Sequence, residues 1–318
     1  MTHAPMEAET DRAQANIAPL KLGSVEIPGF TGTALNDPQE ALAHLHENGF
    51  VVIDSHLGDL CDEAVQEFRE IEARHPEILK READGRYPRL INFHLASPKM
   101  LKLFTQNLLA LAVQDAFFGQ PSSLYTTLFY EKGSTQDLHR DTPYFTTRPE
   151  HQYLGVWTPL EDVDAENGPL MVMQYGHKLP EENREEIAHK LFGDGPIPHT
   201  SDELWIAYQD TVSRRGENEG LFKQYVPIKK GQTIIWHPQL PHGGSPIIDS
   251  GRTRLSLVQH VTPANYQVYG LEAFFKPSME LPTQGAWKLE TTDGRQHIDH
   301  DVVGVGHHVQ VPAAVLRP

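Results

Sequence analysis

The sequence carries a run of polar and aromatic residues that reads Gln136-Asp137-Leu138-His139-Arg140-Asp141-Thr142-Pro143-Tyr144-Phe145. In extended backbone, residues i and i+2 point to the same side, so His139 and Asp141 offer an imidazole nitrogen and a carboxylate oxygen to one point in space. Two adjacent positions of an iron site with two histidines and one carboxylate need this arrangement. The pair alone would equally fit a hydrogen-bonded or salt-bridged pair with no metal. A third candidate ligand is therefore needed to favour a metal site.

A third candidate ligand, His242, follows much later in the chain. It lies between two expected strands, residues 232–237 and 252–261, and two glycines follow it, which allows backbone to come close to a ligand. The second strand carries Arg254. A buried guanidinium is costly unless it meets an anion, and its planar fork suits a carboxylate. These residues together favour a metal site beside which Arg254 binds the carboxylate of a small molecule.

Further motifs occur in a fixed order between Ala41 and Pro263. After His-x-Asp come a strand with a tryptophan, then Asn-Gly-Pro-Leu, Trp-His-Pro, His-Gly-Gly and Arg-x-Ser. This order resembles the phytanoyl-CoA dioxygenase family of Fe(II)/2-oxoglutarate-dependent oxygenases. The resemblance implies a mainly β fold with flanking helices, built on a double-stranded β-helix (jelly-roll, cupin-like) core.

Matched residue by residue, the resemblance implies which side chains do what. Iron would be bound by His139, Asp141 and His242, and Arg254 would pair with the far carboxylate of 2-oxoglutarate. Other residues of the cosubstrate site would be Trp157, Gln136 and Ser256. The chain departs from the family in two places. Gly244 stands where some members have a serine that reaches 2-oxoglutarate, and Tyr175-Gly176-His177 stands where Gly-Ser-His is frequent.

The activity implied is hydroxylation of a small molecule by a dioxygenase that uses Fe(II), O2 and 2-oxoglutarate, with decarboxylation of 2-oxoglutarate to succinate. Related halogenases lack the carboxylate ligand, so Asp141 favours hydroxylation or a related oxidation. Two alternatives remain open: a cupin-type metal enzyme (an isomerase or a dioxygenase without 2-oxoglutarate), which would not need Arg254, and a non-catalytic small-molecule-binding protein on the same fold.

Several residues compete for these roles. His237 precedes Pro238 at a strand end and is interpreted as a core histidine or as one that supports a ligand from behind. His177 is a further rival. His260 shares a strand face with Arg254, which makes it a candidate for the lining of the cosubstrate pocket. Arg252 is the rival for Arg254, but the family spacing favours the latter. By strand alternation Arg140 points away from the metal. Cys61 is expected to be an inert thiol on a helix.

The substrate is not decoded by any motif. We expect the pocket walls to come from residues 86–94, 144–153 and a charged insert. Possible substrate contacts are Arg89, Asn92, Tyr144 and Arg148. A contact from Arg148 would favour an anionic substrate.

The 318 residues are expected to form a flexible arm (1–25), one oxygenase domain (26–275) with a helical insert near 181–220, and a C-terminal extension (276–318). Within the domain we expect helices over 41–49, 59–75 and 98–118, and in the insert over 181–191 and 202–213. The extension is rich in histidine, but it stands apart from the metal motifs in the sequence.

A formal net charge of −16 argues against nucleic acid, a nucleic-acid demethylase included, and against an anionic membrane as partners. The chain has one cysteine, no apolar run of about 20 residues and no signal-peptide pattern at its start. These features predict a cytoplasmic protein, and they leave its oligomeric state open.

Overall fold

Two sheets of mainly antiparallel strands form the centre of the computed structural model, which describes residues 17–22, 25–30, 32–81, 87, 89–133, 135–283, 285–306 and 309–317. The larger sheet has the order β15-β14-β4-β5-β11-β6-β9-β3 and the smaller β1-β2-β8-β7-β10. The larger sheet consists of β3 (Phe50–Asp54), β4 (Leu90–Ile91), β5 (Ser122–Tyr130), β6 (Leu154–Pro159), β9 (Gln232–Trp236), β11 (Ser256–Pro263), β14 (Val302–Val305) and β15 (Val309–Pro312), with β12 (Leu289–Thr292) and β13 (Arg295–Ile298) joined at β5. The smaller consists of β1 (Ile17–Leu22), β2 (Val25–Phe30), β7 (Leu170–Met173), β8 (Lys223–Val226) and β10 (His242–Gly244).

The two sheets pack face to face. One buried cluster joins Phe50 and Ile234 of the larger sheet to Val172 and Val226 of the smaller. A second cluster packs helices α2 (Pro38–Asn48) and α5 (Leu108–Phe118) on the outer face of the larger sheet, through residues such as Leu45 and Leu111. The predicted mainly β fold with flanking helices is therefore confirmed, although the described strands do not close into a barrel.

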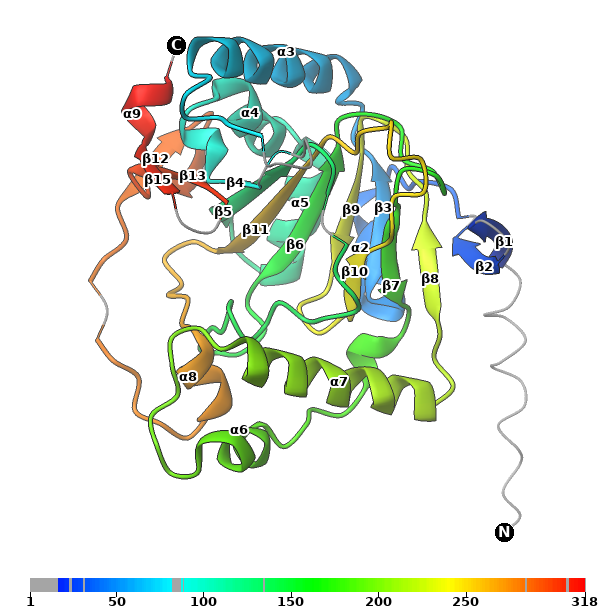
Figure 1. Cartoon of the computed structure of the whole chain (residues 1–318), viewed down its shortest axis with the longest axis vertical. Helices are drawn as coiled ribbons and strands as arrows, with labels where there is room; N and C mark the ends of the chain where they lie inside the picture. Colours follow the sequence, from blue (N-terminus) through cyan, green and yellow to red (C-terminus); the bar gives the residue numbers. More distant parts are fainter. Residues whose placement is uncertain are drawn as a thin grey trace.

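Helices cover the ends and the outer face of the sheets (Figure 1). They are α2 (Pro38–Asn48), α3 (Gly58–Arg74), α4 (Pro98–Thr105), α5 (Leu108–Phe118), α6 (Arg184–Phe192), α7 (Asp202–Asn218), α8 (Leu271–Phe275) and α9 (Ala313–Leu316), with 3-10 turns at Phe93–Leu95 and Gly176–Lys178. Among the described helices, none combines the length and the apolar character that crossing a membrane requires.

The prediction of a single helix over residues 98–118 is wrong in one respect, because this range contains two helices, α4 and α5. α4 ends at Thr105, and Asn107 then caps α5 by accepting a hydrogen bond from the backbone N–H of Ala110 at 3.1 Å. Such a cap satisfies an amide at a helix start, so Asn107 favours a new beginning here. Apolar residues are frequent both before and after residues 106–107, so the sequence pattern does not reveal that one helix ends and another begins there.

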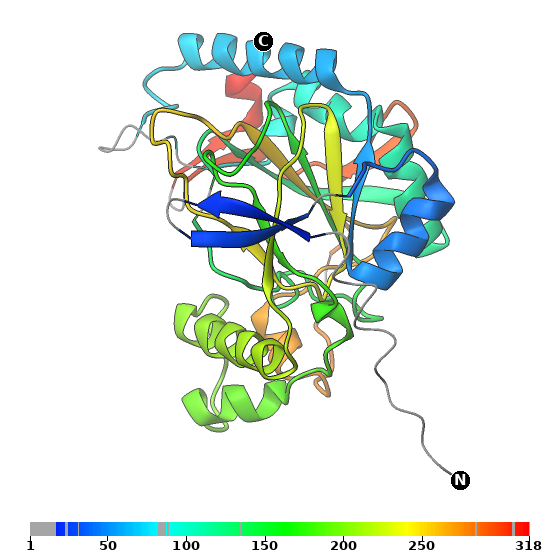
Figure 2. The same cartoon turned by 90° about the vertical axis from the view of Figure 1, so that its right-hand side faces the viewer.

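Described segments near both ends of the chain join the sheets. β1 and β2 form an antiparallel hairpin. β1 lies within the segment expected to be a flexible arm (1–25), and β2 begins at its last residue. β2 pairs with β8 through Gly29 and Tyr225. Figure 2 shows this hairpin in dark blue in front of the sheets. Residues 1–16 of the expected arm lie outside the described residues. The expected C-terminal extension adds β14 beside β4 and β13 beside β5, and so widens the larger sheet.

The charged insert forms α6 and α7 where helices were predicted. In Figure 1 both lie below the sheets together with α8, while α3 lies at the opposite end. An apolar cluster that includes Leu204, Tyr208 and Phe274 holds the three helices together. The insert thus covers the end of the sheets at which the His-x-Asp segment lies (Figure 1).

Candidate metal centre and cosubstrate pocket

The backbone brings the two candidate histidine ligands together. The N–H of His139 donates to the carbonyl of His242 at 2.8 Å, and the N–H of His242 donates back to the carbonyl of His139 at 2.9 Å. Residues paired in this way across antiparallel backbone present their side chains on one face. Because His242 begins β10, which pairs with Val172 of β7, the smaller sheet fixes its place.

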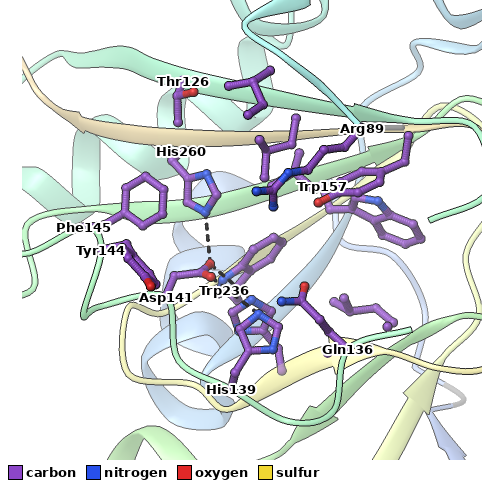
Figure 3. A pocket seen from close by; sticks show the side chains of 18 of the residues that line it. Arg89, Thr126, Gln136, His139, Asp141, Tyr144, Phe145, Trp157, Trp236 and His260 are labelled. Carbon is purple, nitrogen blue, oxygen red and sulfur yellow. Dashed lines mark hydrogen bonds and ion pairs between the residues drawn. The ribbon is translucent and has the colours of Figure 1, made fainter. Parts of the chain in front are cut away.

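The side chains of His139, Asp141 and His242 converge on one point. Each offers one ligand atom, and these atoms lie within 4.8 Å of one another. Nε2 of His139 is 3.5 Å from Oδ1 of Asp141, and Nε2 of His242 is 3.3 Å from Oδ2 (Figure 3). Two imidazole nitrogens and one carboxylate oxygen form the donor set of a non-haem iron site.

Both histidine rings are oriented by the backbone. Nδ1 of His139 lies 2.8 Å from the carbonyl of Asp137, and Nδ1 of His242 lies 3.0 Å from the carbonyl of Leu240. A proton on each Nδ1 satisfies these carbonyls and leaves the lone pair on Nε2, which faces Asp141. Hydrogen bonds of this kind fix the tautomer and ring position of metal-binding histidines.

Asp141 has a third neighbour, His260 on β11, whose Nε2 lies 3.0 Å from Oδ2. The ring of His260 stacks on Phe145 with centroids 3.9 Å apart. Burial alone would raise the pKa of Asp141, but the neighbouring side chains of His242, His139 and His260 hold this pKa well below its usual range. The carboxylate is therefore ionised, as a metal ligand must be.

The centre opens into a cavity of about 920 Å³. The four residues expected in the cosubstrate site all line it: Gln136, Trp157, Arg254 and Ser256. A cavity of this size, with a few polar groups among aromatic and apolar walls, is typical of small-molecule sites.

Arg254 enters this cavity from the segment just before β11. Its backbone N–H donates to the carbonyl of Glu131 at 2.7 Å, and its guanidinium donates to the carbonyl of Gly168. The guanidinium also lies against Gly133, where any Cβ would collide with it. Burial lowers the pKa of Arg254 to about 10, so this side chain is a buried cation at neutral pH.

The rival residues have other roles. Burial lowers the pKa of His237 to about 3, and its Nδ1 accepts a hydrogen bond from the N–H of Gln239. Nε2 of His177 faces the carbonyl of His46. Arg252 binds Asp164 outside the cavity at 2.7 Å. None of these three competes for the metal or the anion.

Arg140 points away from the metal, as predicted. It is buried, and its guanidinium donates to the carbonyl of Gly176 at 2.9 Å. Its backbone is held by Gln209 of α7, whose side chain accepts from the N–H of Arg140 at 2.8 Å and donates to its carbonyl at 3.0 Å. The insert is thus attached to the residue between the two ligands.

The four expected substrate contacts divide into two pairs. Arg89 and Tyr144 line the cavity, whereas Asn92 and Arg148 do not. Asn92 accepts hydrogen bonds from the hydroxyl of Thr126 and the N–H of Thr127, so it holds β5. Arg148 donates to the carbonyl of Ala273 at 2.8 Å and pairs with Glu150. The preference for an anionic substrate that Arg148 suggested therefore loses its basis.

Other lining residues were missed in the sequence. Thr200, Asp202 and Trp205 reach the cavity from the start of α7, and Tyr125 reaches it from β5. The helical insert was expected near the site, but no motif distinguishes its inward face.

The model of the phytanoyl-CoA dioxygenase family matches residues 45–254. The chain belongs to this family. Phytanoyl-CoA dioxygenase of Bos taurus is 25% identical over 150 residues, which are 47% of this chain and 40% of the bovine protein. The Rattus norvegicus protein is 27% identical over 124 residues, 39% and 31% of the two chains. The matches thus span well under half of these relatives.

Solved structures share the fold. The epimerase SnoN, in complex with Fe3+, alpha ketoglutarate and nogalamycin RO, superposes with a TM-score of 0.57 at 21% identity over 82% of this chain and 98% of SnoN. EctD from S. alaskensis in its apoform gives a TM-score of 0.53 at 17% identity over 80% of this chain and 88% of EctD. This similarity confirms the cupin-like, jelly-roll type of fold for the family member described here.

Proposed function

We propose that the protein is an Fe(II)/2-oxoglutarate-dependent dioxygenase that hydroxylates a small molecule and converts 2-oxoglutarate to succinate. The observation that carries the proposal is the placement of Arg254 in the same cavity as the converging ligand atoms of His139, Asp141 and His242. A metal enzyme that does not use 2-oxoglutarate has no need for a buried cation at this place.

The donor set fits ferrous iron. Two imidazoles and one carboxylate on one face suit this metal, and the carbonyls behind the rings hold them in place. Bound Fe(II) would supply the activation of O2 and the oxidising power of the reaction.

The chain's own residues would bind and orient the cosubstrate. Arg254 would anchor its distal carboxylate through a bidentate pair, with Trp157 as a wall and Gln136 and Ser256 as polar neighbours. Gly244 offers no hydroxyl, and the next residue does not replace it, because Ser245 donates its hydroxyl to the carbonyl of Pro169 at 2.7 Å.

The names of related structures support this ligand class. SnoN was solved with Fe3+ and alpha ketoglutarate, and EctD with 2-oxoglutarate and 5-hydroxyectoine. We extend the cosubstrate, but not the substrates, of these proteins to this chain. A small-molecule substrate also agrees with the formal net charge of −16, which disfavours nucleic acid.

Calorimetric titration of 2-oxoglutarate into the anaerobic, iron-loaded protein tests the proposal. A charge-assisted bidentate pair is worth about 1.5–3 kcal/mol, so Arg254→Ala should weaken binding by roughly 10- to 100-fold. Arg252→Ala is the matched control, since this arginine binds Asp164 at the surface. Equal affinities of wild type and Arg254→Ala, or no binding to wild type, would favour a cupin-type enzyme without 2-oxoglutarate.

A further inference from the structure

The part of the cavity toward α7, called the outer part below, is lined by aromatic side chains from α7, from β5 and from the segment that follows His-x-Asp. Tyr144 follows the His-x-Asp segment and contacts Trp205 of α7, with ring centroids 5.0 Å apart. Tyr125 of β5 meets Phe145 edge to face at 5.8 Å. All four rings line the cavity and are partly exposed, so they offer apolar surface to a ligand.

This aromatic wall is fixed to the metal centre. Trp205 lies one helical turn before Gln209, on the same side of α7. Because Gln209 holds the backbone of Arg140, the ring of Trp205 comes to lie 5.6 Å from that of His139. A hydrogen bond between the side-chain oxygen of Tyr144 and the backbone of Ser201 ties the other ring to the start of α7.

The charge of the lining is divided between two ends. Burial raises the pKa of Tyr130, whereas Arg89 and Arg254 both lie near enough for their positive charges to lower it. The two lining arginines therefore share one region of the cavity. On the α7 side, Asp202 is a lining residue and exposed. Ser201 caps α7 by accepting a hydrogen bond from the N–H of Leu204 at 3.2 Å, so Asp202 is the first residue of the helix at the point where it lines the cavity.

Two basic residues near the α7 side are already engaged. Arg148 pairs with Glu150 and donates to the carbonyl of Ala273. Arg184 of α6 pairs with Glu150 at 3.1 Å and lies over the ring of Phe274 at 4.5 Å. Neither lines the cavity, and Asp202 remains the charge that an incoming ligand meets on this side.

We propose that the outer part of the cavity binds an organic cation with an apolar ring or chain, its positive charge facing Asp202 and the rings of Tyr144 and Trp205. This inference rests on the proposed function, which assigns the arginine-lined end to 2-oxoglutarate. Aromatic faces attract cations, and a nearby carboxylate adds to that preference. A coenzyme A thioester, the kind of molecule in the name of the bovine relative, carries several phosphates and would be repelled by Asp202.

Three probes of one shape test the inference: 2-naphthylmethylammonium, 2-naphthylmethanol and 2-naphthoate. Each is titrated calorimetrically into the protein alone and into its anaerobic complex with Fe(II) and 2-oxoglutarate. We expect the ammonium to bind roughly 3- to 10-fold more tightly than the alcohol, and the carboxylate to bind most weakly.

Variants identify the responsible groups. Asp202→Asn should abolish the preference for the ammonium, whereas Glu203→Gln, the next residue in the same turn and equally exposed, should retain it. Trp205→Ala should weaken all three probes, and Trp205→Phe should recover part of the loss.

Three results would overturn the inference: no binding of any probe, an alcohol or carboxylate that binds as tightly as the ammonium, or loss of the preference in Glu203→Gln. The visible absorption of the Fe(II)–2-oxoglutarate complex is recorded on the same samples. If that band forms while the probes show no preference, the cation site alone is refuted; if the band is missing, the proposed function fails.

Discussion

His139 and His242 exchange both of their backbone hydrogen bonds, at 2.8 and 2.9 Å. The distance between the two imidazoles is therefore set by main-chain pairing rather than by side-chain packing. The ring centroids lie 4.8 Å apart, and a change in this pairing would move both rings.

Gly243→Ala tests the dependence of the metal site on this pairing. A Cβ at Gly243 would collide with the carbonyl oxygens of Gln136 and Asp137, which are backbone atoms and cannot turn aside. We expect a loss of about 1–3 kcal/mol in the free energy of unfolding, together with weaker Fe(II) binding. Thermal unfolding and titration against a chelator measure the two effects.

Gly270→Ala is the matched control, because a Cβ there meets nothing within 4 Å. If Gly243→Ala binds iron as tightly as Gly270→Ala, His242 does not depend on the close approach of β10 to residues 136 and 137.

Gln209→Ala tests the attachment of α7 to the metal motif. The change leaves the buried N–H and carbonyl of Arg140 without their partner from α7, at a cost of about 1–3 kcal/mol for each group. We expect lower stability and a weaker affinity for Fe(II), because the segment between the ligands loses its support. Asp210→Ala, an exposed neighbour, should change neither quantity. Unchanged iron affinity in Gln209→Ala would show that α7 is not needed to position the ligands.

His260→Phe tests whether His260 positions the Asp141 carboxylate. Phenylalanine can keep the stacking on Phe145 but removes the donor 3.0 Å from Oδ2. Loss of an outer hydrogen bond to a metal ligand typically lowers metal affinity by about 10- to 100-fold. Chelator competition with Fe(II) or Co(II) measures the effect, and His260→Gln should recover part of it. Equal affinities of His260→Phe and wild type would limit His260 to packing.

Cys61 should resist thiol reagents in the folded protein. Its side chain is fully buried, and burial raises the pKa of the thiol to about 12. At pH 8 this leaves about one thiol in 10⁴ ionised, and only the thiolate reacts. A chromogenic disulfide reagent should report no reaction before unfolding and one thiol after it. Rapid reaction of the native protein would contradict the burial of Cys61.

Part of the candidate site could be predicted because the information is local. His139 and Asp141 share a face in any extended backbone, and Arg254 precedes a strand rich in β-branched and apolar residues. The strands around them follow from the same side-chain pattern. His242 was a candidate from its place between two strands and its following glycines, but only the family resemblance joined it to His139, since their pairing is a long-range contact.

Other features depend on tertiary contacts that no sequence pattern shows. Trp205 and Asp202 line the cavity because of the way α7 packs, through its apolar cluster and through the hydrogen bonds of Gln209 to Arg140. Asn92 and Arg148 were expected in the pocket, but hydrogen bonds to Thr126 and to Ala273 hold them elsewhere. Strand β14 was missed because it is short and gains its stability by pairing with β4.

The most direct test of the central claim is the visible absorption of the protein with Fe(II) and 2-oxoglutarate under anaerobic conditions, for wild type and for His242→Ala. The account predicts a weak metal-to-ligand charge-transfer band in wild type and none in the variant. Wild-type protein that holds iron but shows no such band would contradict the claim that His139, Asp141, His242 and Arg254 together form an iron and 2-oxoglutarate site.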